Sequence, residues 1–204
     1  MVNINIIDYK MGNLYSITKG LEKAGGKITI INEPVDRFDC DALVIPGVGA
    51  FKVAIQNILP FKNAIETFYK SGKPILGICL GLQLFFTQSH EGGIYNGLDF
   101  IKGEVIKFPV NTSKPVPHMG WNTINIKNNQ SQLLQDISNE TYFYFVHSYY
   151  GKPENDKYII SSTNYIVEFP SIIEKENIYL VQFHPEKSST EGLKLLKNFI
   201  KLSE

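Results

Sequence analysis

Short apolar runs alternate with amphipathic stretches along the first half of the chain. Three runs have the length and composition of buried strands: residues 2–7, 27–31 and 42–45. Apolar residues at helical spacing lie between the first two runs: Leu14, Ile17, Leu21 and Ala24. The pair Gly25-Gly26 follows and is a typical helix stop. Strand, helix and strand in this order predict the start of a parallel sheet covered by helices.

The same alternation continues over the next forty or so residues. A second helical face is predicted from Phe61, Ala64, Ile65, Phe68 and Tyr69. The segment Ser71-Gly72-Lys73-Pro74 then ends that helix. The apolar run over residues 74–78 predicts a buried strand, and residues 80–86, apolar on nearly every side, predict a buried helix.

The pentapeptide Gly77-Ile78-Cys79-Leu80-Gly81 lies between this strand and this helix. A strand that turns sharply into a helix forces its apex residue into a strained backbone conformation, and side chains two positions away on either side would clash. The two glycines therefore suit a nucleophile at Cys79, placed at a helix N-terminus where amide dipoles favour thiolate over thiol. The pattern alone leaves a second interpretation open, a small buried cysteine in a glycine-dotted strand.

The second half of the chain is rich in strand signals. Strands are predicted over residues 105–108, 121–126, 142–146, 158–162, 165–169 and 179–183, the fourth and fifth forming an antiparallel pair. A last helix is predicted from Leu193, Leu196, Phe199 and Ile200. Prolines predict an irregular loop over residues 114–122, where Met119 and Trp121 either fold onto the core or form a docking surface. Residues 127–140 predict a polar surface excursion.

These elements together predict an α/β fold of three layers, with an open, mostly parallel (mixed) sheet flanked by helices. No internal repeat, low-complexity tract or linker interrupts the pattern. We therefore expect a single domain over residues 1–204.

Composition and charge narrow the class of protein. Lys plus Arg and Asp plus Glu number 20 each, so no net field attracts nucleic acid or an anionic membrane. The sole arginine is Arg37, which argues against a phosphorylated substrate held by an arginine cluster on this chain. Neither a signal peptide nor an apolar run of about 20 residues is evident, and the two cysteines form no disulfide framework. We expect a soluble, cytoplasmic protein.

A cysteine nucleophile needs a base, and the base needs an acceptor that orients it. Among the four histidines, only His184 directly follows a buried strand and has a carboxylate, Glu186, two residues later. The N–H of Leu80 and the loop Gly47-Val48-Gly49, which follows a neighbouring strand, can form an oxyanion hole. A histidine at a strand end can also be purely structural. Metal-ligand clusters, Walker loops and dinucleotide fingerprints are lacking, so we expect no metal and no cofactor.

The motifs at 77–83 and 181–188, Gly-Ile-Cys-Leu-Gly-Leu-Gln and Val-Gln-Phe-His-Pro-Glu-Lys-Ser, resemble those of the class I (triad-type) glutamine amidotransferases, which have a flavodoxin-like fold. Four further blocks are similar to the glutaminase subunits of imidazole glycerol phosphate synthases. They occupy residues 8–14, 46–51, 117–122 and 144–149. The blocks span nearly the whole chain in family order, so their combination is specific although no single block is.

The resemblance implies a role for each motif residue. Cys79 attacks the side-chain amide of L-glutamine, His184 moves the protons and Glu186 orients His184. Gln83, Ser148 and Tyr149 hold the amino-acid end of glutamine, and the Gly47–Gly49 loop completes the oxyanion hole after a peptide reorientation. Ammonia passes to a partner cyclase subunit with a (β/α)8-barrel fold, in a heterodimer of histidine biosynthesis. The candidate residues of the docking face are Asn13, Met119, Trp121, Tyr144 and Lys187.

Three alternatives are weighed against this interpretation. The first is an amidotransferase subunit of a related synthase, and the second is a stand-alone cysteine hydrolase that acts on γ-glutamyl substrates without a partner. The third is a catalytically silent glutamine-binding module. Loss of the cysteine, histidine or glutamate would mark such a module, and Cys79, His184 and Glu186 are all present.

Overall fold

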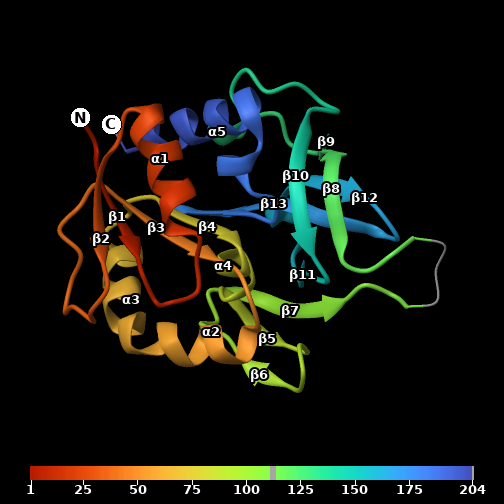
Figure 1. The fold of residues 1–204 in the computed structure, drawn as a ribbon, viewed down its shortest axis with the longest axis horizontal. Coiled ribbons are helices and arrows are strands. Elements are labelled where there is room, and N and C mark those ends of the chain that lie inside the picture. Colours follow the sequence, from red (N-terminus) through yellow and green to blue (C-terminus); the bar gives the residue numbers. More distant parts are fainter. Residues whose placement is uncertain (111–113, 204) are drawn as a thin grey trace.

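The computed structural model describes residues 1–110 and 114–203 and is built around one eight-stranded sheet (Figure 1). Its strands, in spatial order, are β2 (Lys27–Ile31), β1 (Asn3–Ile7), β3 (Ala42–Gly47), β4 (Ile75–Cys79), β14 (Ile178–Val181), β13 (Glu168–Lys175), β12 (Ile159–Asn164) and β9 (Asn125–Ile126). The first five strands are mutually parallel, and the last three continue the sheet in antiparallel pairing. The mixed, mostly parallel sheet predicted from the sequence is confirmed.

Helices cover both faces of the parallel part of the sheet. Helices α1 (Leu14–Ala24) and α5 (Ser189–Lys201) lie together on one face, and α2 (Phe51–Ile58) and α3 (Lys62–Lys70) lie on the other (Figure 1). Helix α1 begins where the Asn13 side chain accepts a hydrogen bond from the Ser16 N–H, and it ends at Gly25 in a left-handed conformation. The three predicted layers are therefore present.

Two smaller sheets pack beside the antiparallel part of the main sheet, one through β13 and the other through β12. One has the order β11 (Tyr149–Pro153), β7 (Ile101–Lys107), β5 (Phe86–Ser89) and β6 (Tyr95–Asn96). The other pairs β10 (Tyr142–His147) with β8 (His118–Thr123) in antiparallel fashion. The short elements are α4 (Leu80–Gln83) and the 3-10 turns η1 (Leu59–Phe61), η2 (Gln132–Leu134), η3 (Asp156–Tyr158) and η4 (Pro185–Lys187).

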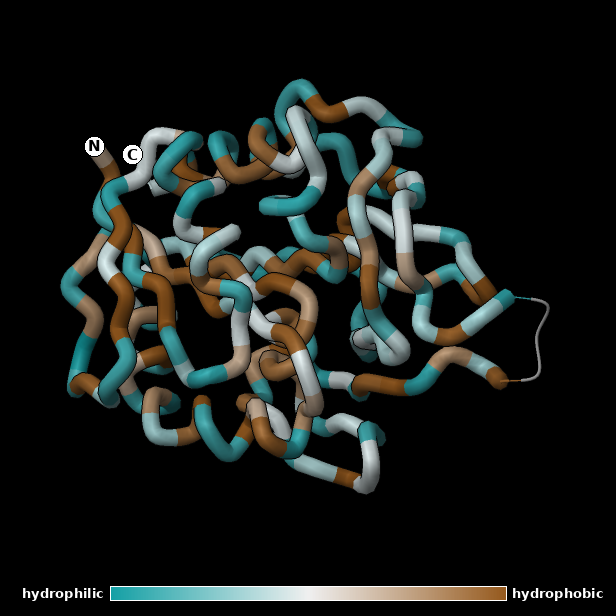
Figure 2. Tube along the Cα trace, viewed as in Figure 1, coloured by the Kyte–Doolittle hydropathy of each residue, from teal (hydrophilic) through white to brown (hydrophobic). Residues whose placement is uncertain are grey.

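The hydrophobic core divides along the sheet. One cluster lies between the sheet and α1 and α5, and another lies between the sheet and α2 and α3. Strands β3 and β4 are buried along their whole length because both of their faces are covered by helices. Figure 2 shows the same pattern, with hydrophobic segments concentrated in the central strands and hydrophilic ones in the outer turns.

Three predictions about individual elements are wrong. The predicted helix over residues 80–86 stops at Gln83, and Phe86 already begins β5. The predicted irregular loop contains β8, since the prolines precede the strand rather than interrupt it. The predicted polar excursion over residues 127–140 instead buries Leu133, Leu134 and Ile137 in the core on the α5 side. The helix α2 was also not predicted.

No helix in the described ranges is both long and apolar enough to cross a membrane. The expectation of a single domain over residues 1–204 stays a prediction.

Candidate active site

Cys79 sits at a sharp turn between β4 and α4. Its backbone has φ 55° and ψ −109°, a region that residues other than glycine rarely occupy. The turn leaves no room for side chains around it. A Cβ added at Gly81 would lie 1.9 Å from the Ile45 carbonyl oxygen, and one at Gly77 would lie 2.7 Å from the Leu180 side chain. The crowding inferred from the two glycines is therefore present in the structure.

His184 and Glu186 form a buried pair directly after β14. The His184 Nδ1 atom lies 2.8 Å from Glu186 Oε1, and the two side chains are 2% and 4% exposed. Since a carboxylate only accepts, Nδ1 carries a proton and Nε2 is the nitrogen left to exchange a proton with Cys79. The Nε2 atom is buried and has no hydrogen-bond partner among the described residues. Burial lowers the pKa of His184, but the attractions of Cys79 and then Glu186 outweigh it and raise the pKa to about 10.

A cavity of about 250 Å³ opens beside the Cys79 sulfur. Its lining consists of Val48, Gly49, Cys79, Leu80, Gln83, Glu91, Pro117, Val146, His147, Ser148 and Tyr149. The three predicted glutamine-binding residues and most of the predicted oxyanion-hole residues are in this set. The volume lies below the range of roughly 300–1,000 Å³ that is usual for drug-sized ligands, so it suits a molecule as small as an amino acid.

The predicted oxyanion loop is held in a definite conformation. The Val48 N–H donates to the Met11 carbonyl at 2.9 Å, and the Tyr9 hydroxyl donates to the Pro46 carbonyl at 2.6 Å. The Val48 N–H is therefore not directed at the cavity in this conformation. Gly49, the next residue, has φ +107°.

Two side chains at the site were not predicted from the sequence. The Gln182 amide nitrogen lies 3.7 Å from the Cys79 sulfur, and Glu91 lines the cavity while accepting a hydrogen bond from the Phe51 N–H at 3.0 Å. Burial raises the pKa of Glu91. Gln182 lies two residues before His184, and the alternation of an extended chain places both on one side, so that spacing was an available signal. Nothing in the sequence connects Glu91 with Cys79.

Two buried histidines link the cavity to β8. His147 Nδ1 lies 2.8 Å from the Tyr149 carbonyl, which only accepts, so Nδ1 carries the proton and Nε2 accepts from His118 Nδ1 at 3.0 Å. His118 Nε2 then accepts from Asn122 at 3.2 Å. Burial lowers the pKa of His118 to about 4 and that of His147 to about 3, so both rings are neutral near pH 7.

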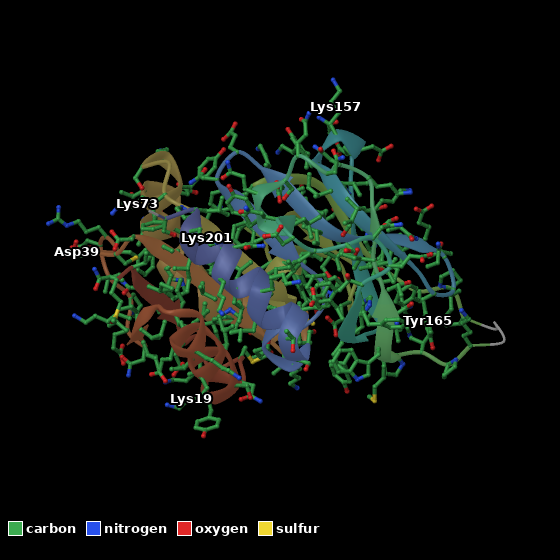
Figure 3. The ribbon with its side chains drawn as sticks, turned by 90° about the horizontal axis from the view of Figure 1, so that it is seen from above. Lys19, Asp39, Lys73, Lys157, Tyr165 and Lys201 are labelled. Carbon is green, nitrogen blue, oxygen red and sulfur yellow. The ribbon has the colours of Figure 1, made fainter. Side chains whose placement is uncertain are left out.

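Most of the predicted docking residues lie on or beside the β8–β10 sheet. Met119 and Trp121 are 62% and 52% exposed, and the Trp121 ring meets the Tyr144 ring edge-on at 6.1 Å. The Lys187 ammonium lies 6.0 Å from the centre of the Tyr144 ring. Asn13 lies at the start of α1, the helix that packs against the η4 turn carrying Lys187. Figure 3 shows β8 from above, beside the labelled Tyr165, whose ring stacks on buried His118 at 4.0 Å.

The fold and site define a class of protein. Residues 5–202 match the family profile described as glutamine amidotransferase class-I, so the chain belongs to that family.

Closer relatives identify the subgroup. The chain is 46% identical to the imidazole glycerol phosphate synthase subunit HisH of Archaeoglobus fulgidus, with 98% of each chain covered. It is 47% identical to the subunit HisH 1 of Campylobacter jejuni, covering 98% of this chain and 100% of the relative. Within the class I amidotransferases, the chain thus belongs to the glutaminase subunits of imidazole glycerol phosphate synthase, which act in histidine biosynthesis.

Solved structures share the fold at low sequence identity. A putative GMP synthase protein from Thermoplasma acidophilum has a TM-score of 0.74 and 19% identity, covering 100% of this chain and 94% of that one. PurLQS from Thermotoga maritima has a TM-score of 0.73 and 16% identity, covering 99% and 97%. These likenesses confirm the predicted fold class.

We predict that Gly81→Ala destabilises the protein by about 2–4 kcal/mol, because the added Cβ would meet the backbone of β3, which is buried and cannot yield. Urea unfolding followed by circular dichroism measures the change. Gly72→Ala is the control without a clash: a Cβ there meets nothing within 4 Å, so the variant should lose only about 1 kcal/mol from the left-handed φ of +76°. Equal losses of stability in the two variants would contradict a steric origin.

We also predict that His118→Phe flattens the pH dependence of stability. Because burial lowers the pKa of His118 to about 4, the unfolded chain binds one more proton than the folded chain between pH 4 and 6.5, and stability falls as the pH falls. The variant should reduce that slope by about 1 kcal/mol per pH unit between pH 5 and 6. Urea titrations at several pH values measure it. Tyr165→Phe, which disturbs the same stack without removing a histidine, should keep the wild-type slope.

Proposed function

We propose that this protein hydrolyses L-glutamine at Cys79 and supplies ammonia to a cyclase subunit that makes imidazole glycerol phosphate. The supporting observation is the buried pairing of His184 with Cys79, whose sulfur lies at a cavity of amino-acid size. The thiol proton moves to Nε2, and the sulfur attacks the amide carbon of glutamine. The imidazolium then protonates the departing nitrogen, which leaves as ammonia, and a glutamyl thioester remains.

The second half of the reaction uses the same groups in reverse. His184 takes a proton from water, and the resulting nucleophile attacks the thioester and releases glutamate and the Cys79 thiol. Glu186 keeps the imidazole in one tautomer and stabilises its positive charge in both halves.

Substrate recognition is assigned to the cavity walls. Glutamine carries an α-ammonium, which needs a hydrogen-bond acceptor, and an α-carboxylate, which needs hydrogen-bond donors. The Glu91 carboxylate is the anionic group of the lining, and we assign the α-ammonium to it. Gln83, Ser148 and Tyr149 hold the remainder of the amino-acid end, Gln83 being fixed by its hydrogen bond to the Tyr149 carbonyl at 2.9 Å.

The oxyanion hole needs a change of conformation before it can act. The tetrahedral intermediate requires N–H groups directed at its oxygen, and Leu80, the first residue of α4, supplies one. We propose that a second comes from the Gly47–Gly49 loop once a peptide there reorients and releases the Val48 N–H from the Met11 carbonyl.

We assign the docking of the cyclase, which has a (β/α)8-barrel fold, to the face formed by Met119, Trp121, Tyr144 and Lys187, with Asn13 at its margin, in a cytoplasmic heterodimer. Exposed aromatic and methionine side chains are enriched at protein interfaces. This face adjoins the site, because Val146 lines the cavity and pairs with Met119. Exposed Met119 and Trp121 also favour a partnered enzyme over a stand-alone γ-glutamyl hydrolase.

We predict that Cys79→Ala abolishes glutamine hydrolysis in the complex with the cyclase and leaves ammonia-dependent formation of imidazole glycerol phosphate intact, because the chemistry after ammonia release belongs to the partner. Glutamate release and product formation are measured on the same samples. Cys40→Ala serves as the control and should keep both activities. Loss of the ammonia-dependent activity in Cys79→Ala would contradict the division of labour.

We predict that Trp121→Ala weakens binding of the cyclase by about 10–100-fold, since a large aromatic residue at the centre of an interface contributes about 2 kcal/mol or more. Isothermal titration calorimetry with the purified cyclase measures the affinity. Leu59→Ala removes a similarly exposed apolar side chain from the turn between α2 and α3 and should bind as the wild type does. An unchanged affinity in Trp121→Ala would contradict the assignment of the docking face to this surface.

A further inference from the structure

We propose that Gln182 is a catalytic residue, whose side-chain amide stabilises the Cys79 thiolate by donating a hydrogen bond to the sulfur. The inference rests on the proposed function, because it takes Cys79 as the nucleophile. Gln182 is fully buried directly after β14, and its amide nitrogen lies 3.7 Å from the sulfur. Its main-chain N–H donates to the Ser171 carbonyl at 3.0 Å, which fixes the residue against β13.

The orientation of the Gln182 amide follows from its neighbours. The Tyr149 carbonyl can only accept, so the Gln83 atom that lies 2.9 Å from it is the amide nitrogen. The same nitrogen lies 3.4 Å from the Gln182 side chain, which must therefore present its oxygen there. The Gln182 nitrogen is left to face Cys79. The Tyr149 carbonyl therefore fixes the orientation of the Gln83 amide, and Gln83 in turn fixes that of Gln182, so that the Gln182 N–H points at the sulfur.

A donor at this position favours the thiolate over the thiol. In the neutral form, the Cys79 S–H has an acceptor, the Val146 carbonyl at 3.8 Å. When the proton moves from the sulfur to His184 Nε2, that carbonyl oxygen faces a negative charge and opposes it. The Gln182 N–H strengthens its hydrogen bond at the same moment, because bonds to ionised acceptors are the stronger ones. Gln182 therefore acts on the anionic state that attacks the substrate.

The other titratable groups around the sulfur do not replace this donor. In the cavity wall, the ionised Glu91 carboxylate can only accept, and the His147 ring donates its Nδ1 proton to the Tyr149 carbonyl. His184 faces Cys79 from the end of β14 and is the acceptor of its proton. Tyr9 faces it from the end of β1, but its hydroxyl proton is already donated to the Pro46 carbonyl. Burial and the charge of Cys79 both raise the pKa of Tyr9, so this hydroxyl stays neutral. Gln182 is thus the side-chain amide assigned to the sulfur.

The test measures the reactivity of Cys79 without glutamine. Iodoacetamide labels a thiolate but not a thiol, and a Cys40→Ala background restricts labelling to Cys79. Gln182→Glu keeps the shape and the acceptor for Gln83 but replaces the donor with an acceptor, and Gln182→Leu removes both. We expect the midpoint of the rate–pH profile to rise by about one pH unit or more in Gln182→Leu, which removes the donor without adding a charge, and to rise further in Gln182→Glu. Labelling should be about 10-fold slower at pH values below the parent midpoint. At high pH the rates of variant and parent should converge.

The control is Asn198→Leu, which removes a buried amide of α5 that bonds the Leu133 and Gln135 carbonyls rather than the sulfur. It should keep the parent profile. A uniform slowing at all pH values with an unchanged midpoint, in either Gln182 variant, would reduce Gln182 to a structural residue and overturn the inference. A parent protein that neither labels at Cys79 nor hydrolyses glutamine would instead overturn the proposed function.

Discussion

The site depends on one steric constraint, the close packing of the turn after Cys79 against β3. Gly47 and Cys79 are register partners at the ends of the two parallel strands β3 and β4, and Gly81 lies under the Ile45 carbonyl. This packing holds Cys79 at a positive φ, which costs of order 1–3 kcal/mol and persists only when the surroundings enforce it. The central sheet thereby fixes the position of the sulfur and of the predicted oxyanion loop together.

The partner groups of the sulfur come from the other half of the chain, and main-chain contacts hold them in place. The His184 N–H donates to the Tyr144 carbonyl at 2.9 Å, and the Tyr144 N–H donates to the Ser188 hydroxyl at 3.0 Å. The Ser188 hydroxyl in turn donates to the His184 carbonyl at 2.6 Å. The strand that carries Tyr144 at the proposed docking face is thus bonded directly to the loop that carries the base. A displacement of β10 would therefore move the His184 backbone directly, with no other element in between.

The parts of this structure that the sequence predicts are those with a periodic or a local signal. The parallel strands, α1, α3 and α5 have regular apolar spacing. The pentapeptide around Cys79 and the segment His184-Pro185-Glu186 are short sequence motifs. The helix at residues 80–86 was predicted too long because a segment buried on all sides has no periodicity to mark its end. Gln182 and Glu91 act through contacts with residues far along the chain, 103 positions away for Gln182 and Cys79. The spacing of Gln182 from His184 places both on one side of the chain, but the contact with Cys79 itself arises from the topology of the sheet.

The resting site is better provided with acceptors than with donors. Main-chain carbonyls of Met11, Pro46, Val146 and Tyr149 receive hydrogen bonds around the cavity, and the Val146 carbonyl faces the sulfur itself. Negative charge develops first on the sulfur and then on the substrate oxygen, so carbonyls nearby are unfavourable and N–H groups are needed. On the sulfur, the Gln182 amide meets that need within the present conformation. For the substrate oxygen, the N–H donor must come from a loop whose Val48 N–H is already bonded to the Met11 carbonyl. The thiolate can therefore form in the present conformation, whereas stabilisation of the tetrahedral intermediate requires the loop to change.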